Sequence, residues 1–184
     1  MERYDKYKES VIPWLPEIPA HWDSSKIKSH FRLRTTKVSD KDFQALSVSK
    51  NGITPQLETA VKTDNGDNRK LVKKGDFVVN SRSDRKGSCG VSPFDGSVSL
   101  INIVLEPIDG YTHYYHHLLR SNDYVEEFYR NGRGIVADLW TTRWNEMSSI
   151  VIPFPPIEEQ KRIVAYLDKK ITLIESCKCQ RERE

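Results

Sequence analysis

Cysteine is scarce in this chain of 184 residues, which contains only Cys89, Cys177 and Cys179. A small, odd number of cysteines argues against a framework of disulfide bridges. Cys177 and Cys179 lie in a segment with a helical pattern, where residues two positions apart point to different faces, so they are not expected to share a metal ion. We interpret all three as reduced thiols with a structural or incidental place in the fold.

Long apolar runs are missing too. The longest, residues 101–105 and 150–154, are interrupted by Asn102 and Pro153. They fall far short of the roughly 18–20 residues that a helix needs to cross a bilayer. The first residues also lack the apolar stretch of a secretory signal. The sequence therefore predicts a cytoplasmic protein without a membrane span.

The short motifs of common catalytic sites are absent as well, among them phosphate-binding Gly-rich loops, the Gly-x-Ser-x-Gly turn and the His-Glu-x-x-His zinc motif. Three histidines, His113, His116 and His117, share one helical segment. A zinc site there would need further ligands, so we interpret the histidines as part of a partly exposed helical face. Predicted loops contain the aspartates Asp64, Asp67, Asp84 and Asp95. Their spacing does not distinguish Mg²⁺ ligands from ordinary polar turn residues. The sequence predicts no cofactor, no metal and no catalytic residue.

Charged residues, in contrast, are abundant at 30% of the chain, and 29 Lys and Arg against 26 Asp and Glu give a net charge of +3. The basic residues gather in three stretches, at 69–74, 82–86 and 130–143. Basic clusters in loop-like sequence are what a surface that contacts nucleic-acid phosphates needs. For any single cluster, solvated surface charge is the simpler interpretation.

Three regions of different character follow one another, and together they predict an α+β fold. Residues 1–25 form an arm whose three prolines between positions 13 and 19 block a helix or a central strand. Trp14, Ile18 and Trp22 would hold this arm against the domain. Residues 26–154 form a strand-rich domain with a few helices, and residues 155–184 form the start of a long helix.

The middle region alternates strands and turns. Residues 43–49 alternate apolar and polar side chains, and residues 98–104 do so less cleanly. Residues 71–79 have the pattern of an apolar pair, a turn and a β-branched strand. Residues 82–90 are polar, basic and rich in Gly and Ser, which predicts a surface loop of the kind that carries function.

Residues 112–131 place apolar side chains at helical spacing, with Thr112 as the candidate N-cap and Asn122 as a candidate break. A short buried strand is expected at 150–152. Two prolines then end the strand and start a helix whose first turn holds Glu158 and Glu159, where the helix dipole favours anions.

An apolar stripe follows along this last helix, at Val164, Leu167, Ile171 and Ile174. It covers about two heptads, fewer than the three or four that indicate a coiled coil. The stripe can lie on the body of the chain itself or pair with a helix outside the chain. We take these four residues as candidate assembly residues.

The run PFPPIEEQKRIVAYLD, residues 153–168, resembles the segment that closes each target-recognition domain in the specificity (S) subunits of type I restriction–modification systems. Residues 7–22 are similar to the opening segment of the same family, as are GDFVVN at 75–80 and the stretch from 132 to 153. The resemblance therefore covers nearly the whole chain.

The resemblance implies a non-catalytic subunit that binds double-stranded DNA and supplies sequence recognition. Separate modification (M) subunits would methylate adenine, and separate restriction (R) subunits would cut DNA. A complete S subunit usually has two recognition domains separated by two long antiparallel spacer helices, and it reads a bipartite site. Since this chain has one domain and the start of one spacer helix, we expect a fragment or a half-subunit that would need to form a homodimer.

Arg and Lys are favoured for reading guanine, and Asn or Gln for reading adenine, while contacts to phosphate fix the register. The residues expected to bind DNA lie in the loop 82–86, in neighbouring strand ends and in the other basic stretches. They are Lys50, Asn51, Arg69, Lys70, Asn80, Arg82, Ser83, Arg85, Lys86, Arg133 and Arg143.

Two other functions remain open from the sequence. A small Mg²⁺-dependent nuclease would use the loop aspartates as metal ligands. An assembly module without DNA reading would use only the apolar stripe between residues 157 and 174.

Overall fold

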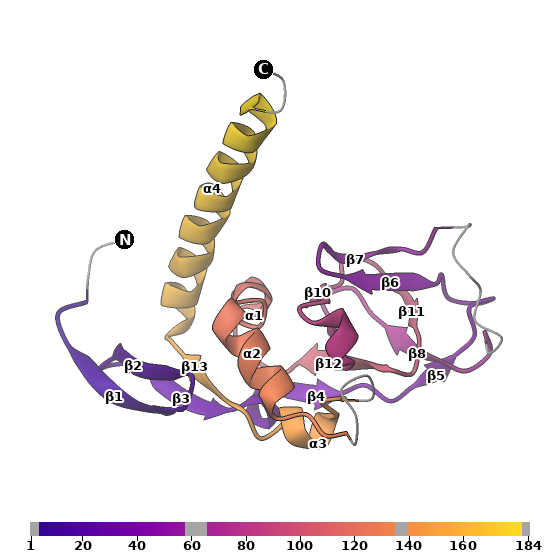
Figure 1. Cartoon of the computed structure of the whole chain (residues 1–184), viewed down its shortest axis with the longest axis horizontal. Coiled ribbons are helices and arrows are strands. Elements are labelled where there is room, and N and C mark those ends of the chain that lie inside the picture. The colour runs from indigo at the N-terminus through magenta and orange to yellow at the C-terminus, as the bar shows by residue number, and fades with distance from the viewer. Residues whose placement is uncertain (1–3, 58–65, 135–139, 182–184) are drawn as a thin grey trace.

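A strand-rich body carries one long helix, α4 (Ile157–Arg181), which projects away from it (Figure 1). The computed structural model describes residues 4–57, 66–134 and 140–181. The mixture of short strands and a few helices confirms the predicted α+β fold. No helix among the described residues has both the length and the apolar character to cross a membrane.

The N-terminal arm is a β-hairpin, in which β1 (Tyr7–Ile12) pairs antiparallel with β2 (Leu15–Pro19). A two-stranded ribbon tolerates the prolines of this segment because each strand needs a partner on one side only. Ile12 and Ile18 are buried. At the turn, the Trp14 indole N–H donates to the carbonyl oxygen of Val151 (3.2 Å), and its ring meets that of Tyr124 edge-on.

The main sheet has the strand order β10-β9-β12-β4. Its members are β4 (Phe31–Leu33), β9 (Phe77–Asn80), β10 (Cys89–Val91) and β12 (Asn102–Pro107). Successive side chains of a strand point to opposite faces, so this sheet supplies two cores. Phe77 and Leu105 pack on the side covered by the helices, while Val78 and Val104 pack on the other side.

The second core is closed by smaller elements. A second sheet has the strand order β11-β8-β5, and the β6–β7 hairpin lies beside it. These strands are β5 (Lys37–Val38), β6 (Leu46–Ser49), β7 (Gly52–Pro55), β8 (Arg69–Val72) and β11 (Gly96–Val98). The apolar residues they contribute are Leu46, Ile53, Val72 and Val98.

Helices cover the first core. They are α1 (Thr112–Leu118), α2 (Asn122–Arg130) and the single-turn α3 (Trp144–Met147). Strand β3 (Asp23–Lys26) pairs antiparallel with β13 (Val151–Phe154), which leads directly into α4. Two short 3-10 helices, η1 (Ile27–Ser29) and η2 (Ser83–Arg85), complete the described elements.

A buried ion pair anchors the turn before β9. Arg34 donates from Nε and Nη2 to the two carboxylate oxygens of Asp76, at 2.7 and 3.0 Å, and Asp76 also accepts from the Lys73 N–H. Gly75 has φ +93°, a conformation that favours glycine. In this turn Gly75 therefore supplies the backbone conformation, and Asp76 supplies the hydrogen-bond acceptors.

Three sequence expectations need adjustment. The alternating residues 98–104 are not one strand, because a turn at 99–101 separates β11 from β12. The predicted helix 112–131 is two helices, as the candidate break suggested, and Tyr111 rather than Thr112 is the N-cap of α1. The loop predicted at 82–90 contains η2 and ends earlier, where Cys89 and Gly90 enter β10.

Candidate nucleic-acid interface and the base of the long helix

The loop between β9 and β10 is exposed, basic and tightly held. Asp84 pairs with Nε of Arg82 (3.0 Å) and, at 3.7 Å, with Nε of Arg85. The Asn80 side-chain oxygen accepts the N–H of Arg82 (3.1 Å). Each arginine pairs with Asp84 through Nε, and a guanidinium has four further N–H donors. This arrangement orients two guanidinium groups at the surface and leaves most of their N–H donors outside the contacts with Asp84.

The segment 140–143 brings distant residues to this loop. Thr141 forms isolated antiparallel bridges with both Arg82 and Arg133, and the N–H of Ser83 donates to the carbonyl of Trp140 (3.1 Å). Arg133 pairs with Glu146 at 3.3 Å, and together with Arg143 both residues line one small hollow. The structure therefore places Arg82, Arg133 and Arg143 on neighbouring elements, although they are far apart in sequence.

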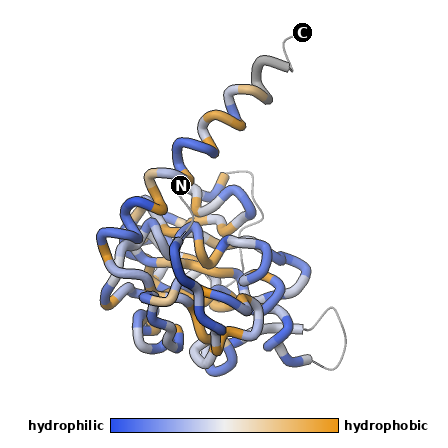
Figure 2. Tube along the Cα trace, turned by 90° about the vertical axis from the view of Figure 1, so that its left-hand side faces the viewer, coloured by the Kyte–Doolittle hydropathy of each residue, from blue (hydrophilic) through white to orange (hydrophobic). Residues whose placement is uncertain are grey.

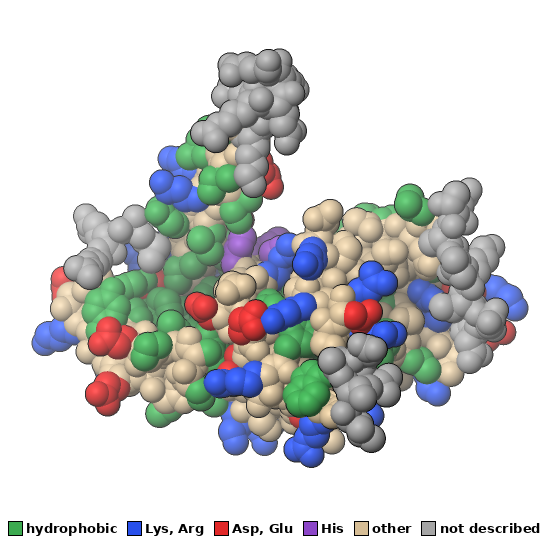
Figure 3. Space-filling view, viewed as in Figure 1, with side chains coloured by type: hydrophobic (Ala, Val, Ile, Leu, Met, Phe, Trp, Pro, Cys, Tyr) green, Lys and Arg blue, Asp and Glu red, His purple; other side chains and the backbone are tan. Residues whose placement is uncertain are grey.

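A cleft of about 730 Å³ opens between this loop and α2. Its walls include the side chains of Trp14, Ser83, Lys86 and Trp140. Lys86 pairs with Glu126 of α2 at 2.6 Å. In Figure 3, the face over α2 shows acidic and basic side chains next to one another. This cleft is thus aromatic and mixed in charge.

Lys50 and Asn51 form the exposed turn of the β6–β7 hairpin. The Arg120 guanidinium holds this turn in place, since it donates to the carbonyl of Lys50 (2.8 Å) and to the carbonyl of Cys89 in β10 (2.9 Å). The hairpin turn therefore lies beside the strand into which the basic loop leads.

Arg69 was expected to bind DNA, but its side chain is buried. Its side chain donates to the hydroxyl and to the carbonyl of Ser97, at 2.9 and 3.0 Å, and the residue is 4% exposed. A buried guanidinium used in this way is not available to phosphate. Lys70, its neighbour, is half-buried, and its Nζ donates to the carbonyl of Asn102 (2.6 Å).

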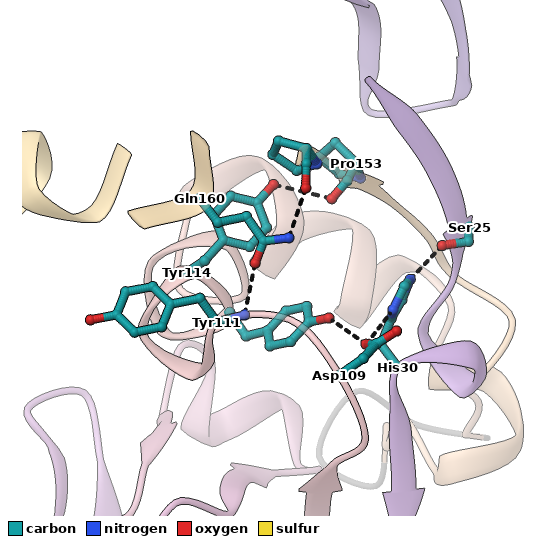
Figure 4. A network of polar contacts seen from close by, with 9 residues as sticks. Ser25, His30, Asp109, Tyr111, Tyr114, Pro153 and Gln160 are labelled. Carbon is teal, nitrogen blue, oxygen red and sulfur yellow. Dashed lines mark hydrogen bonds and ion pairs between the residues drawn. The ribbon is translucent and has the colours of Figure 1, made fainter. Parts of the chain in front are cut away.

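The base of α4 is locked into the domain by the buried amide of Gln160. Its Oε1 accepts the N–H of Tyr111 and its Nε2 donates to the carbonyl of Pro155, both at 2.8 Å (Figure 4). The Tyr114 hydroxyl donates to the carbonyl of Pro153 (3.1 Å) in the same network. Gln160 is 0% exposed, so its bonds fix where the helix begins.

Glu159 holds the helix to the arm. It accepts from the His21 ring (2.8 Å) and from the Trp22 indole (3.0 Å), and its side chain is 6% exposed. Burial by itself would raise the pKa of Glu159, but hydrogen bonds from Tyr4, His21 and Trp22 outweigh it and leave the pKa below its ordinary value. Glu159 and Gln160 are neighbours in the sequence, but they connect α4 to different parts of the chain. Glu159 connects it to the arm, and Gln160 connects it to the domain.

A second polar network lies nearby and joins Ser25, His30 and Asp109 (Figure 4). The order of these side chains is that of a hydrolytic triad, but their setting is that of a packed core. His30 is 4% exposed and stacks on Phe154 at 4.3 Å, and Asp109 also accepts from the Tyr115 hydroxyl. We assign this network to the support of β3 and of the connection before α1.

The apolar stripe of α4 is divided between the domain and solvent. Val164 is 4% exposed and belongs to the first core, so it is not available to a partner, contrary to expectation. Leu167 is half-buried, while Ile171 and Ile174 are exposed. Apolar positions recur along the projecting part of the helix in Figure 2, and heptad counting missed exposed Leu173.

The comparisons with known proteins decide the family. A family model described as "Type I restriction modification DNA specificity domain" matches residues 19–184, nearly the whole chain. The chain belongs to this family. The family resemblance predicted from residues 153–168 is thereby confirmed.

Solved structures with the same fold as this specificity domain include three type I restriction–modification chains. The HsdS subunit from Thermoanaerobacter tengcongensis is 19% identical with a TM-score of 0.68, and the match covers 90% of this chain and 46% of that one. The type I S subunit from M. genitalium is 19% identical with a TM-score of 0.58, covering 90% and 43%. A chain from a structure concerning complex assembly and conformational transition of the type I R-M system is 18% identical with a TM-score of 0.61, covering 89% and 41%.

The specificity domain therefore spans less than half the length of these three solved chains. Comparison with curated protein sequences finds no match. At these identities the structural likeness concerns the fold alone.

The aspartates that a nuclease would use are dispersed in the specificity domain. Asp67 accepts from Ser39, Asp84 pairs with Arg82, and Asp95 accepts the N–H of Lys74. Asp64 lies outside the described residues. Within 4–57, 66–134 and 140–181, no group of three or more His, Cys, Asp or Glu side chains could hold a metal ion.

Several residues at these sites carry no signal in the sequence that marks them as functional. Trp14 and Trp140 line the largest of the clefts described above, and Arg120 holds the hairpin turn. Gln160 was not among the candidate residues, although it is buried in the domain. The structural signal that could have found Gln160 is its place in the first turn of the helix that follows the proline pair, because unpaired backbone groups near helix ends need partners.

We predict that Glu159→Gln lowers stability at neutral pH but not in acid. The folded-state pKa lies below the ordinary value of 4.5, so the ionised carboxylate stabilises the fold above about pH 4.5, and this contribution is lost as the pH falls through the folded-state pKa. Urea unfolding should give a difference of about 1–2 kcal/mol near neutrality. A difference that stays the same however far the pH is lowered below 4.5 while the chain remains folded would contradict the linkage argument.

Proposed function

We propose that this specificity domain reads one half of a bipartite DNA target and docks methyltransferase (M) subunits, through which restriction (R) subunits join. The observation that carries the proposal is the exposed loop 80–86, in which Asp84 pairs with both Arg82 and Arg85. Arg held in this way can donate to the two acceptors of guanine in the major groove. The chain itself performs no chemistry in this proposal.

The elements around the loop supply contacts to the DNA backbone. Arg133 and Arg143 lie on the segment bridged to Arg82, and Lys50 and Asn51 lie on the hairpin turn beside β10. The other proposed contacts of the interface are Lys70, Asn80, Ser83 and Lys86. Arg69 is left out because its guanidinium is buried against Ser97.

The proposal divides the chain into an arm (1–25), a recognition domain (26–154) and a spacer (155–184). The support for this division is that Glu159 and Gln160 connect the arm and the domain to the first turn of α4, beyond which α4 projects (Figure 1). A helix held in this way transmits the orientation of the domain to whatever binds its exposed stripe.

DNA reading is tested by enrichment from a pool of duplexes with a randomised centre, using the full chain. We expect a short common sequence to be enriched, and affinity for it to fall steeply as salt rises, since phosphate contacts release counterions. Recovery of unrelated sequences in every round would overturn sequence-specific reading. Incubation of the enriched duplex with Mg²⁺ should leave it uncut, and cleavage would instead favour the nuclease.

The docking part predicts that Leu167→Asp together with Ile174→Asp abolishes co-purification with an M subunit while the chain still folds. Both side chains lie on the projecting helix, and Ile174 is 55% exposed, so a carboxylate there disturbs a partner more than the domain. Ala165→Asp, also exposed on α4, is the matched control and should retain the complex. Retained co-purification of the double variant would contradict this role of the helix.

A further inference from the structure

A second hollow, of about 520 Å³, lies beside the proposed interface. It is bordered by the turn between β11 and β12, by Lys70 of β8 and by the segment that carries Arg143 and Trp144. Its volume falls within the range of roughly 300–1,000 Å³ that is usual for small-ligand sites. We call it the Lys70–Arg143 hollow.

The charge of this hollow differs from that of the larger cleft. Among the described residues, its lining contains two cations and no carboxylate. The cleft beside α2, in contrast, is lined by Lys86 and Arg130 but by the three acids Asp123, Glu126 and Glu127. Thr141 and Arg143 also line the adjacent hollow that contains Arg133. The Lys70–Arg143 hollow therefore favours an anionic occupant.

The Lys70 ammonium has hydrogen-bond donors that an anion in the hollow could use. It donates one hydrogen bond, to the carbonyl of Asn102 (2.6 Å), and an ammonium has three donors. Burial lowers the pKa of Lys70, because its charge is only partly solvated. An anion beside it would offset this cost.

Apart from Ser81 and Thr141, the rest of the lining is apolar. Leu100 and Ile101 form the tip of the turn between β11 and β12, and they are 42% and 39% exposed. Residues at the tip of such a tight turn are usually polar. Trp144 also belongs to the lining and is half-buried against the core. A flat, weakly polar group fits against such a lining, as bases do on the stacking surfaces of proteins that bind single strands.

We propose that the Lys70–Arg143 hollow binds one nucleotide unit, with its base against Leu100, Ile101 and Trp144 and its phosphate between the two cations. This rests on the proposed function, because the occupant is then a nucleotide displaced from the DNA duplex. A free mononucleotide has the same chemistry, and the experiment below separates the two sources.

The test uses the full chain and two labelled duplexes of one sequence, one fully paired and one with a single unpaired adenosine nucleotide at its centre. Fluorescence anisotropy should show about tenfold tighter binding of the duplex with the unpaired nucleotide, since stacking of one base adds to the affinity. Ile101→Asp and Arg143→Gln should each remove this preference. Ile108→Asp is the matched control, since Ile108 is 53% exposed and lies outside the hollow lining.

A second arm titrates the chain with deoxyadenosine monophosphate, with deoxyadenosine and inorganic phosphate as comparisons. Binding of the monophosphate alone, lost in Ile101→Asp and Arg143→Gln, would assign a free mononucleotide to the hollow. Equal affinity for the two duplexes without monophosphate binding overturns the hollow but leaves the proposed function standing. A preference that survives both substitutions also overturns it. Failure to bind either duplex overturns the proposed function, and the monophosphate arm then decides the hollow alone.

Discussion

Gln160→Leu should lower the free energy of unfolding by about 1–3 kcal/mol or more, because it leaves a buried backbone carbonyl without a partner, and a partly buried N–H at a smaller cost. These groups are the N–H of Tyr111 and the carbonyl of Pro155, each 2.8 Å from the Gln160 amide. Leucine nearly conserves the volume, so the loss reports on hydrogen bonding rather than on a cavity. Urea unfolding of the chain and of the variant measures it.

Gln44→Leu is the matched control, because the Gln44 side chain is exposed and a surface change of this kind usually costs less than about 0.5 kcal/mol. A similar small value for Gln160→Leu would mean that the two backbone groups find other partners. The start of α4 would then not depend on this amide, and the rigid connection between domain and spacer would lose its main support.

The fold class could be predicted from the sequence because periodicity reports burial. The apolar positions of 71–79 identified β8, the turn and β9, and the proline pair at 155–156 identified the start of α4. The turn at 99–101 was missed because Leu100 and Ile101 are apolar where turns are usually polar. The stripe on α4 was misjudged at Val164, since spacing alone does not say whether a side chain meets its own domain or a partner.

The candidate interface was harder to predict, because composition does not show which cations are neutralised. Arg69 and Arg82 look alike in sequence, but the first is buried against Ser97 and the second is exposed with Asp84. Trp140 comes to the basic loop through the bridges of Thr141 and through the bond from the Ser83 N–H to its own carbonyl. Such contacts join residues that are far apart in the chain, and no local pattern encodes them.

Arg82→Ala and Arg85→Ala should each weaken binding to the enriched duplex by about 1–3 kcal/mol and relax its sequence preference at one position, if these side chains read base edges. Their common partner, Asp84, sharpens the test. Asp84→Asn removes the carboxylate that orients both arginines but keeps both positive charges. It should therefore reduce discrimination between sequences while affinity for unrelated duplexes stays the same or rises.

Lys8→Ala is the matched control, because it removes one exposed positive charge from β1 in the arm and should change affinity little. The two roles of the loop differ in their salt dependence. Loss of a phosphate contact lowers the slope of log affinity against log salt by about one and weakens all duplexes alike, whereas loss of a base contact affects the enriched sequence most. Unchanged affinity and preference in both arginine variants would remove the loop 80–86 from the reading surface and leave Arg133, Arg143 and the hairpin turn at Lys50 as the remaining candidates.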